Sequence, residues 1–379
     1  MKYSKRTGAS YPAANVKPLS VLLVLAALSA PGVRAPSPLR VETIVSGLDT
    51  PWDLAWGPDG ALWVTERGGT ISRVNPSTGQ LTRVGRIDVV EVSESGLMGM
   101  AFHPDFGTSP YVYFAHSYRR LSRVRNRLVR MRFEDGRLGT PEVLLDGIPG
   151  NRNHNGSRLA VGPDGYLYMT TGDAGQGDLA QELGSLAGKV LRLSLDGRPA
   201  PGNPYGSFVY SYGHRNPQGI VFHPATGALY VAEHGPGDND ELNRVRIGGN
   251  YGWPDVHGFC DGETSREEAF CRSHDVQEPI RAWTPTVALS GLAFYDAELI
   301  PGWKGSLLVT SLRGATLFRL KLSAAGREVV ERELLFEGEY GRLRDVLVGP
   351  RGEVYLATSN RDGRGRPAAE DDRILRIAP

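Results

Sequence analysis

The 379-residue chain has few of the residues and patterns that would point to several common classes of protein. It contains two cysteines, Cys260 and Cys271, and two cysteines alone do not make a zinc site. Its net charge of +1 gives no reason to expect nucleic acid or an anionic membrane as a partner. Helical periodicity is almost absent, and the best match is SREEAFCRSH, a short insertion that starts at Ser265. These absences favour a β-rich protein without a nucleic-acid partner.

One apolar run stands out, VLLVLAALSA at residues 21–30, and ten residues are too few to span a bilayer. Basic residues precede it at positions 2, 5, 6 and 17, and Val33-Arg34-Ala35 offers a small-x-small cleavage site. This arrangement predicts a signal peptide over residues 1–35 and a periplasmic or secreted protein with no membrane span. A buried N-terminal helix is the weaker alternative, because Pro31 and Gly32 follow the run at once.

The two cysteines are eleven positions apart in a polar, loop-like stretch. In an exported protein such an even pair predicts one local disulfide. Two unpaired thiols are the alternative.

The 48 glycines and 26 prolines imply many turns, and one phrase containing such a turn recurs six times. It consists of an apolar stretch, a turn that contains proline and usually Asp or Gly, and an alternating apolar strand. Five copies carry proline at matching positions: Pro58, Pro104, Pro163, Pro224 and Pro350. The six copies are DLAWGPDGALWVTERGG, GMAFHPDFGTSPYVYFAHS, RLAVGPDGYLYMTTGD, GIVFHPATGALYVAEHG, GLAFYDAELIPGWKGSLLVTSLRG and DVLVGPRGEVYLATSNRDG.

Further strand-like runs lie between the phrases, so each repeat holds about four strands, as a propeller blade does. The sequence therefore predicts an all-β fold, a six-bladed β-propeller of four-stranded antiparallel blades, as one domain over residues 36–379. A β-sandwich would not need six copies of one phrase. The arginine-rich run at residues 119–133 alternates as an outer blade strand would, which explains it better than nucleic-acid binding.

Polar residues stand in front of each predicted innermost strand, and in a propeller these positions converge on one rim of the central channel. Any one of them alone is more often a turn or cap residue, but their convergence favours a site. Histidine titrates near neutrality, so His154 is the natural general base, and Glu94 is placed to partner that base or to bind substrate hydroxyls. The arginines suit a polycarboxylate or a developing oxyanion. The residues that stand in front of the predicted innermost strands are Trp52, Asp53, Glu94, His154, Arg215, Asn216, Thr286, Arg342 and Arg344.

A second group of candidate ligands lies in the glycine-rich stretch over residues 232–255. It offers Asp238, Asp240, Glu241 and many backbone carbonyls, and calcium takes six to eight oxygen ligands in flexible loops of this sort. The spacing is not that of an EF-hand, so a calcium site and a solvated acidic turn both remain open.

Four longer motifs extend these observations: GHRNPQGIVFHPATGALYVAEHGPGDNDELNRVRIGGNYGWP, SGLMGMAFHPDF, GKVLRLSLDG and LRDVLVGPRG. With them the chain resembles, from about residue 40 to the end, the soluble pyrroloquinoline quinone (PQQ)-dependent sugar dehydrogenases, which comprise glucose dehydrogenase and the shorter aldose sugar dehydrogenases. The short loops are more similar to those of the aldose sugar branch. The resemblance implies a six-bladed propeller, export to the periplasm, and PQQ and calcium as cofactors.

The resemblance also implies roles for individual residues. His154 is the base toward the C1 hydroxyl, while Arg215 and Asn216 contact the reacting quinone carbonyl and the cofactor. Arg342 and Arg344 bind the carboxylates of the cofactor, and Thr286 binds the cofactor with an alignment uncertain by one residue. The carbonyls of Gly235 and Pro236 hold a calcium ion beside PQQ, and Glu241 with the Tyr251 carbonyl resembles a second, structural calcium site.

Three positions depart from the glucose enzymes of this family. Glu94 replaces a glutamine, Asn153 replaces an aspartate before the histidine, and Arg313 replaces a lysine that contacts the cofactor. Arginine retains the positive charge of lysine with a different reach and geometry. These departures concern substrate preference and cofactor affinity more than the type of reaction.

The sequence thus predicts a quinoprotein that oxidises the C1 hydroxyl of aldoses to lactones. Hydride goes to PQQ with calcium as Lewis acid, Arg215 and His154 act at the reacting centre, and Glu94 and Asn153 face the substrate. The expected partners are aldose sugars and an artificial or respiratory-chain electron acceptor, and the protein is expected to be a monomer or homodimer. Two alternatives share the fold: a calcium-dependent lactonase or esterase, and a non-enzymatic glycan-binding propeller.

Overall fold

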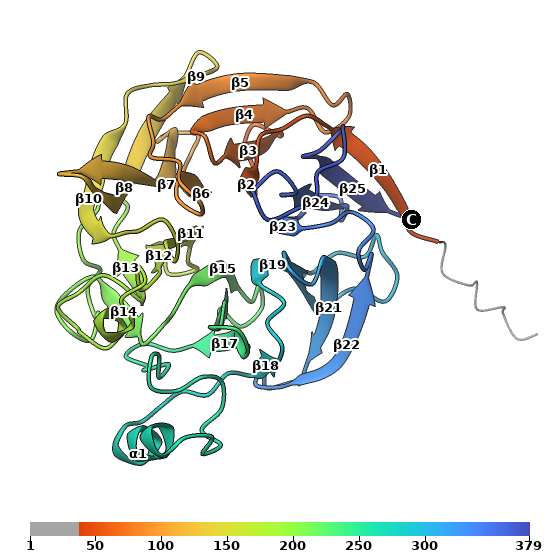
Figure 1. The fold of residues 1–379 in the computed structure, drawn as a ribbon. Coiled ribbons are helices and arrows are strands. Elements are labelled where there is room, and N and C mark those ends of the chain that lie inside the picture. Colours follow the sequence, from red (N-terminus) through yellow and green to blue (C-terminus); the bar gives the residue numbers. More distant parts are fainter. Residues whose placement is uncertain (1–37) are drawn as a thin grey trace, which may run out of the picture. The chain divides into compact units, whose positions relative to one another are not determined.

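The computed structural model describes residues 38–379, so the predicted signal peptide lies outside the described residues. Six antiparallel sheets are arranged as a ring around a central channel, with the first strand of each sheet innermost (Figure 1). Five sheets have four strands, and the sheet of the second blade has a fifth, short strand at its edge. The predicted six-bladed β-propeller is confirmed.

The first three blades follow each other along the chain. The first comprises β2 (Pro51–Trp56), β3 (Leu62–Glu66), β4 (Thr70–Val74) and β5 (Leu81–Arg86). The second comprises β6 (Leu97–Phe102), β7 (Tyr111–Arg120), β8 (Arg123–Glu134), β9 (Arg137–Leu138) and β10 (Glu142–Pro149). The third comprises β11 (Gly156–Val161), β12 (Leu167–Thr171), β13 (Lys189–Leu193) and β14 (Val209–Tyr212), with the 3-10 helix η1 (Gly177–Ala180) between β12 and β13.

The remaining blades complete the ring. The fourth comprises β15 (Pro217–Phe222), β16 (Leu229–Glu233), β17 (Asp240–Val245) and β18 (Arg281–Trp283), with helix α1 (Ser265–Ser273) inserted before β18. The fifth comprises β19 (Leu289–Tyr295), β20 (Ser306–Ser311), β21 (Thr316–Leu322) and β22 (Val329–Leu335). The sixth comprises β23 (Leu343–Val348), β24 (Val354–Thr358), β25 (Ile374–Ala378) and β1 (Arg40–Val45).

The sixth blade closes the ring with a strand from the beginning of the described chain. β1 pairs antiparallel with β25, from Arg40 opposite Ala378 to Val45 opposite Ile374 (Figure 1). Nothing in the repeated phrase predicts this pairing, because β1 precedes the first copy. The two ends of the propeller therefore stabilise each other directly.

The repeated phrase forms the two inner strands of each blade and the turn between them. In the first blade, the Gly57 N–H donates to the Ala61 carbonyl at 2.8 Å, and the Trp63 indole donates to Asp59 at 3.2 Å. Gly60 has φ 77°, a conformation that glycine adopts without steric cost. Every first strand therefore runs from one end of the channel towards its turn, and every second strand returns. We call the end where first strands begin and second strands end the site end.

The hydrophobic core lies between neighbouring blades. Trp63 and Ile71 of the first blade pack with Met100 and Phe114 of the second, and all four side chains are buried. Burial of aromatic and branched side chains between twisted sheets supplies the main stabilisation of such a ring. The channel walls are thereby fixed, so the residues at the site end are held on a rigid frame.

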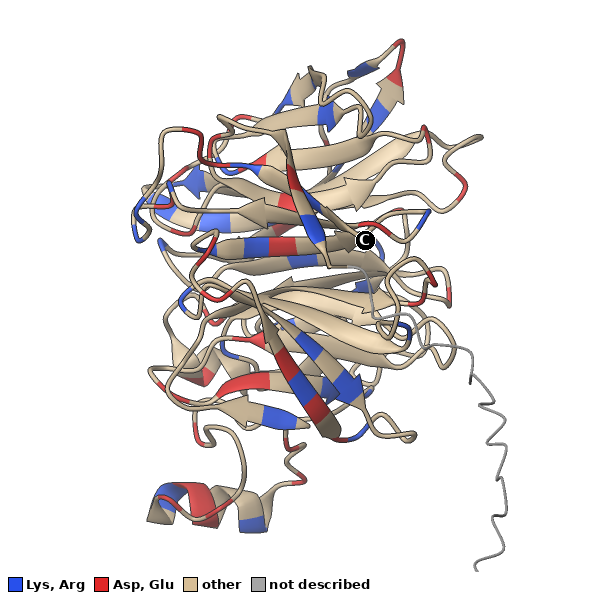
Figure 2. Ribbon diagram, turned by 90° about the vertical axis from the view of Figure 1, so that its right-hand side faces the viewer, with Lys and Arg blue, Asp and Glu red and all other residues tan. Residues whose placement is uncertain are grey.

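The fourth blade carries the insertion predicted from SREEAFCRSH. Thr264 caps α1 by accepting the Glu267 N–H, and Cys260 and Cys271 form a disulfide with their Cα atoms 6.1 Å apart. The arginine-rich run forms the hairpin of β7 and β8, in which Arg130 pairs with Glu142 and Asp196 at 2.8 and 2.7 Å. Figure 2 shows basic and acidic residues intermingled on one side of the ring. Within residues 38–379 no helix is long and apolar enough to cross a membrane.

Candidate active site

His154 precedes β11 at the site end, and its imidazole is held by a carboxylate that the sequence analysis did not identify. Nδ1 lies 2.8 Å from Oδ1 of Asp173, which follows β12 on the same hairpin. Asp173 is buried and also accepts the Trp253 indole N–H at 2.8 Å and the Gly175 N–H at 2.6 Å. Because the carboxylate oxygen acts as the acceptor, Nδ1 is the nitrogen that carries a proton, and in the neutral tautomer Nε2 is left as an acceptor.

The close approach of the two loops requires a glycine beside Asp173. A Cβ atom on Gly172 would lie 2.1 Å from the carbonyl oxygen of His154. His154 itself has φ 59°, an uncommon backbone conformation for a residue with a side chain. The backbone of His154 is thus strained, and this conformation positions the imidazole.

Glu94 holds the backbone of His154 and does not touch its ring. Its Oε2 accepts the His154 N–H at 2.9 Å and the Asn216 amide at 3.4 Å, while Oε1 accepts Arg364 at 2.8 Å. Burial alone would raise the pKa of Glu94, but the charge of His234, the His154 N–H and Arg364 lower it to about 2. Glu94 is therefore ionised and fixes the loop that carries the predicted base.

Asn153 lies next to the imidazole, half-buried, and its Oδ1 accepts the Ser93 hydroxyl at 2.7 Å. This bond joins the lead-in loops of the second and third blades. The amide nitrogen of Asn153 makes no hydrogen bond within residues 38–379, so it is free to donate to a ligand.

Arg215 and Asn216 come from the lead-in to β15 and border the same end of the channel. The guanidinium of Arg215 lies over the Trp253 ring at 5.2 Å and donates to the His234 carbonyl at 3.0 Å. Burial lowers the pKa of Arg215, and its Nε is buried without a hydrogen-bond partner. Asn216 is fully buried and accepts the Gly156 N–H at 3.2 Å. Through Trp253 and Asp173, Arg215 is connected to His154.

Arg344 lies inside the channel wall and not on the rim. It is buried, donates to the side-chain amide oxygen of Gln218 at 2.8 Å and lies over the Trp52 ring at 5.6 Å. Within the described residues no carboxylate pairs with it, and burial lowers its pKa to about 9.

Trp52 and Asp53, which the sequence placed on the rim, are likewise buried within β2, so that prediction was wrong. Asp53 pairs with Arg158 at 2.5 Å in the channel interior, and Arg158 also pairs with Asp345 at 3.1 Å.

The inward displacement of these residues has a common physical cause. The pairing of each first strand shifts register near its start, for example between Pro51 and Asp53 and between Leu343 and Asp345. A bulge of this kind turns side chains away from the direction that a regular alternation predicts.

Arg313 and Arg342 lie together on the site end and line an open pocket of about 440 Å³ with Arg364 and Arg366. Arg342 pairs with Asp362 at 2.7 Å, whereas the Arg313 side chain is exposed. Thr286 donates its hydroxyl to Asp240, which also accepts the Val287 N–H at 2.7 Å. The predicted cofactor residues thus lie towards one end of the channel, and Asn216 and Arg344 are buried there.

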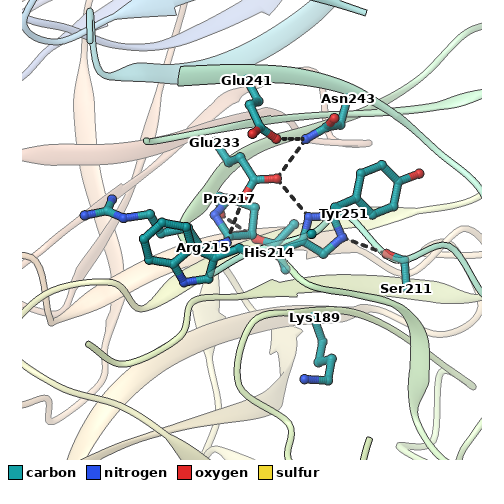
Figure 3. A network of polar contacts seen from close by, with 12 residues as sticks. Lys189, Ser211, His214, Arg215, Pro217, Glu233, Glu241, Asn243 and Tyr251 are labelled. Carbon is teal, nitrogen blue, oxygen red and sulfur yellow. Dashed lines mark hydrogen bonds and ion pairs between the residues drawn. The ribbon is translucent and has the colours of Figure 1, made fainter. Parts of the chain in front are cut away.

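The candidate metal ligands lie in and behind the loop after β16. The carbonyl oxygens of Gly235 and Pro236 accept no hydrogen bond within residues 38–379, and the Gly235 N–H donates to Asp240 at 2.9 Å. Behind this loop, Asn243 donates to Glu233 at 2.9 Å and to Glu241 at 2.8 Å (Figure 3). Burial and the neighbouring Glu233 raise the pKa of Glu241, and the Asn243 side-chain oxygen is buried without a partner.

A buried chain of polar residues links this carboxylate group to Arg215. His214 lies between Ser211, at 2.9 Å, and Glu233, at 2.8 Å, and its ring stacks on Tyr251 (Figure 3). The other oxygen of Glu233 accepts the Arg215 N–H at 2.8 Å. This row of hydrogen-bonded residues is fully buried at Ser211 and His214. It therefore positions the Arg215 loop and is not accessible to a substrate.

Fold and site together define a class of protein, a propeller with a histidine–carboxylate pair and a buried arginine, Arg344, that has no carboxylate partner within the described residues. The model of the Glucose / Sorbosone dehydrogenase family matches residues 48–375. The chain belongs to this family, which confirms the sugar dehydrogenase resemblance found in the sequence.

Individual relatives match over most of their length. Quinoprotein glucose dehydrogenase B of Acinetobacter calcoaceticus is 31% identical, over 85% of this chain and 85% of that protein. Aldose sugar dehydrogenase YliI of Escherichia coli is 30% identical, over 94% and 98%. The PQQ-bound structure of aldose sugar dehydrogenase from Streptomyces coelicolor is 39% identical with a TM-score of 0.79, covering 91% of this chain and 99% of that chain.

Proposed function

We propose that this protein is a PQQ-dependent dehydrogenase that oxidises the C1 hydroxyl of aldose sugars to lactones. The observation that carries the proposal is the His154–Asp173 pair, which leaves Nε2 of His154 as a hydrogen-bond acceptor at the site end. A base in this state can take the proton of a sugar hydroxyl while the C1 hydrogen leaves as hydride. The names of the relatives support the substrate class.

Two features of the arginines fit an anionic cofactor. Arg344 is a buried cation without a carboxylate partner, and burying a charge is unfavourable unless it is paired. Arg215 and Arg344 each have a buried Nε without a partner, so both have donor capacity left. Carboxylates of PQQ would compensate these charges, and when bound the quinone would supply the hydride acceptor. The residues proposed to hold it are Arg215, Asn216, Thr286, Arg313, Arg342 and Arg344.

Calcium is proposed at two places. The free carbonyls of Gly235 and Pro236 are oxygen ligands of the kind that calcium prefers, and there the ion would act as a Lewis acid beside the quinone. Glu241, with the Tyr251 carbonyl, forms the proposed structural site, supported by the paired buried carboxylates and the unpartnered Asn243 oxygen. A cation there would offset the repulsion between Glu233 and Glu241.

The remaining residues around His154 orient the reaction. Glu94 and Asn153 border the proposed sugar site, with Glu94 acting chiefly by holding the backbone of the base. Arg215 is proposed to face the developing negative charge at the reacting centre. We further propose export to the periplasm or beyond and transfer of electrons to a dye or a respiratory-chain acceptor.

Reconstitution tests the proposal. The purified chain is incubated with PQQ and calcium, and glucose, galactose and maltose oxidation is followed with a redox dye alongside the absorption spectrum of bound cofactor. We expect PQQ to bind and sugars to be oxidised only when it is present. Lactone hydrolysis with calcium alone would support the lactonase alternative, and glycan binding without turnover would support the binding propeller.

A further inference from the structure

We infer that the active site has a subsite for an anionic group on the sugar, so that its substrates include aldoses carrying a carboxylate or phosphate. This inference rests on the proposed function and extends its substrate class. It is drawn from an open pocket of about 650 Å³ at the site end. Its lining includes Ser93, Asn153 and four arginines, Arg67, Arg152, Arg361 and Arg364.

The pocket adjoins the proposed base through a chain of short contacts. The carbonyl of Arg152 accepts the Glu94 N–H at 2.8 Å, and the Glu94 carboxylate accepts the His154 N–H at 2.9 Å. The other Glu94 oxygen accepts Arg364 at 2.8 Å. Arg152 thus lies two residues before His154 in the sequence, and the hydrogen bond from Glu94 fixes its backbone. A sugar with its C1 hydroxyl at His154 would have this pocket beside it.

The charges of this pocket are only partly balanced within the protein. Arg67 pairs with Glu91 at 3.2 Å and Arg364 with Glu94 at 2.8 Å. Arg361 donates only to backbone carbonyls, among them that of Asp371, and the exposed Arg152 guanidinium makes no hydrogen bond or ion pair within residues 38–379. Asp362, also in the lining, is paired with Arg342. The guanidinium groups of Arg152 and Arg361, which lie on different blades, thus have no carboxylate partner within the described residues.

Guanidinium groups bind carboxylates and phosphates through paired, charge-assisted hydrogen bonds. The pocket is distinct from the one lined by Arg313 and Arg342, two of the residues proposed to hold the cofactor, although Arg364 borders both. An anion here would therefore be carried by the substrate. A hexuronate retains the pyranose ring and C1 hydroxyl of glucose, so its C1 hydride and hydroxyl proton would leave to the quinone and to His154 in the same way.

The test compares matched sugars with the PQQ- and calcium-loaded protein: glucose with glucuronate, galactose with galacturonate, and glucose 6-phosphate for the phosphate group. We expect kcat/KM for glucuronate to exceed that for glucose by about 10-fold at low salt, because an unscreened arginine–carboxylate contact is worth about that factor. The advantage should shrink at about 0.5 M salt, where charges are screened. A uronate advantage without a phosphate advantage assigns the subsite to carboxylates, and the reverse assigns it to phosphates.

Arg152→Gln is the main variant, since this side chain makes no contact that the fold needs, and Arg361→Gln is the second. Each should reduce the glucuronate-to-glucose ratio of kcat/KM about threefold, mainly through KM. Arg198→Gln is the control, because Arg198 is also exposed without a side-chain partner but lies at the opposite end of the channel. It should change neither rate.

Three outcomes would overturn the inference: no advantage over the neutral sugar for either the uronates or glucose 6-phosphate in the wild type, equal effects of Arg152→Gln on the neutral and the anionic sugar, or an effect confined to the KM of an anionic dye. The last outcome would assign the pocket to the electron acceptor. If no aldose is oxidised at all, the proposed function fails instead, and calorimetry of glucuronate with wild type and Arg152→Gln at low salt then decides the subsite on its own. Absence of uronate binding, or binding insensitive to the substitution, would reject it.

Discussion

The imidazole of His154 and the carboxylate of Asp173 meet at 2.8 Å although one precedes and the other follows a β-hairpin. Antiparallel pairing of β11 with β12, from Gly156 opposite Thr171, brings the two ends of this hairpin together. The pair therefore depends on the pairing of the two inner strands of one blade.

Replacing His154 by alanine should reduce sugar oxidation by about 10²- to 10⁴-fold, the usual effect of removing a general base. The fold and PQQ binding should persist, because the ring hydrogen-bonds only to Asp173 within the described residues. Steady-state rates at saturating PQQ, with the cofactor spectrum and melting temperature recorded in parallel, measure this. Near-normal turnover would remove His154 from the mechanism.

Asp173→Asn separates positioning from catalysis. The amide cannot fix Nδ1–H as a carboxylate does, so we expect a loss on the order of 10²-fold or more in kcat. Because both residues act as one unit, the double variant with His154→Ala should be no slower than His154→Ala alone. Additive losses in this cycle would show that Asp173 acts elsewhere.

Arg344→Ala should weaken PQQ binding by about one to two orders of magnitude, since a charge-assisted bond contributes roughly 1.5 to 3 kcal/mol. Turnover should largely recover at saturating PQQ, whereas Arg215→Ala should stay slow if that residue faces the quinone oxygen. Titration with PQQ at fixed calcium, with occupancy and rate measured separately, distinguishes the two variants. Arg351→Ala is the control, because this exposed arginine lies beside the turn between β23 and β24. Unchanged PQQ occupancy in both test variants would exclude this region as the cofactor site.

The sequence predicted the ring and much of its site end because both depend on a local repeat. Pro58-Asp59-Gly60 and its counterparts specify a turn, and the turn places the flanking strands. His154, Arg215 and Asn216 could then be assigned to one end of the channel from their position in front of the first strands alone. Their convergence needed no knowledge of packing.

Other parts of the site could not be predicted from the position of a residue relative to the repeated phrase. Asp173 follows a second strand, and only the pairing of the hairpin shows that such positions reach the same end as His154. Asp53 and Arg344 turn inward at bulges, which alternation does not reveal. The closing strand β1 carries no copy of the phrase, so its partner β25 became apparent only in three dimensions.

Removing calcium should destabilise the protein through Glu241. Burial and Glu233 raise the pKa of this carboxyl in the folded state, so without metal its contribution to stability is present below about pH 4.3 and lost as the pH rises through the raised value. Bound calcium favours the ionised form, and an excess of about 100-fold over Kd stabilises by roughly 3 kcal/mol. The melting temperature should therefore rise with calcium, and more at pH 8 than at pH 5.

Glu241→Gln should abolish this calcium response, as followed by differential scanning calorimetry with and without a chelator. Glu263→Gln is the matched control, because Glu263 is exposed and belongs to a separate acidic group with Asp261 and the buried Glu267 on the insertion. A response lost with Glu263→Gln and kept with Glu241→Gln would place the stabilising ion on the insertion.

The last prediction concerns His116, a buried residue of β7 to which no part in the proposed chemistry is assigned. Burial lowers its pKa to about 4, against about 6.5 in an unfolded chain, so the folded protein holds a neutral imidazole in this interval while the unfolded chain takes up a proton. Its contribution to stability is therefore complete above pH 6.5 and is lost as the pH falls to 4, a change on the order of 3 kcal/mol. Urea unfolding of wild type and His116→Gln from pH 7 to pH 4 should show a steeper loss in the wild type. His274→Gln, an exposed histidine that ends α1, controls for loss of an imidazole as such. Parallel pH curves for wild type and His116→Gln would show that His116 binds its proton equally in both states.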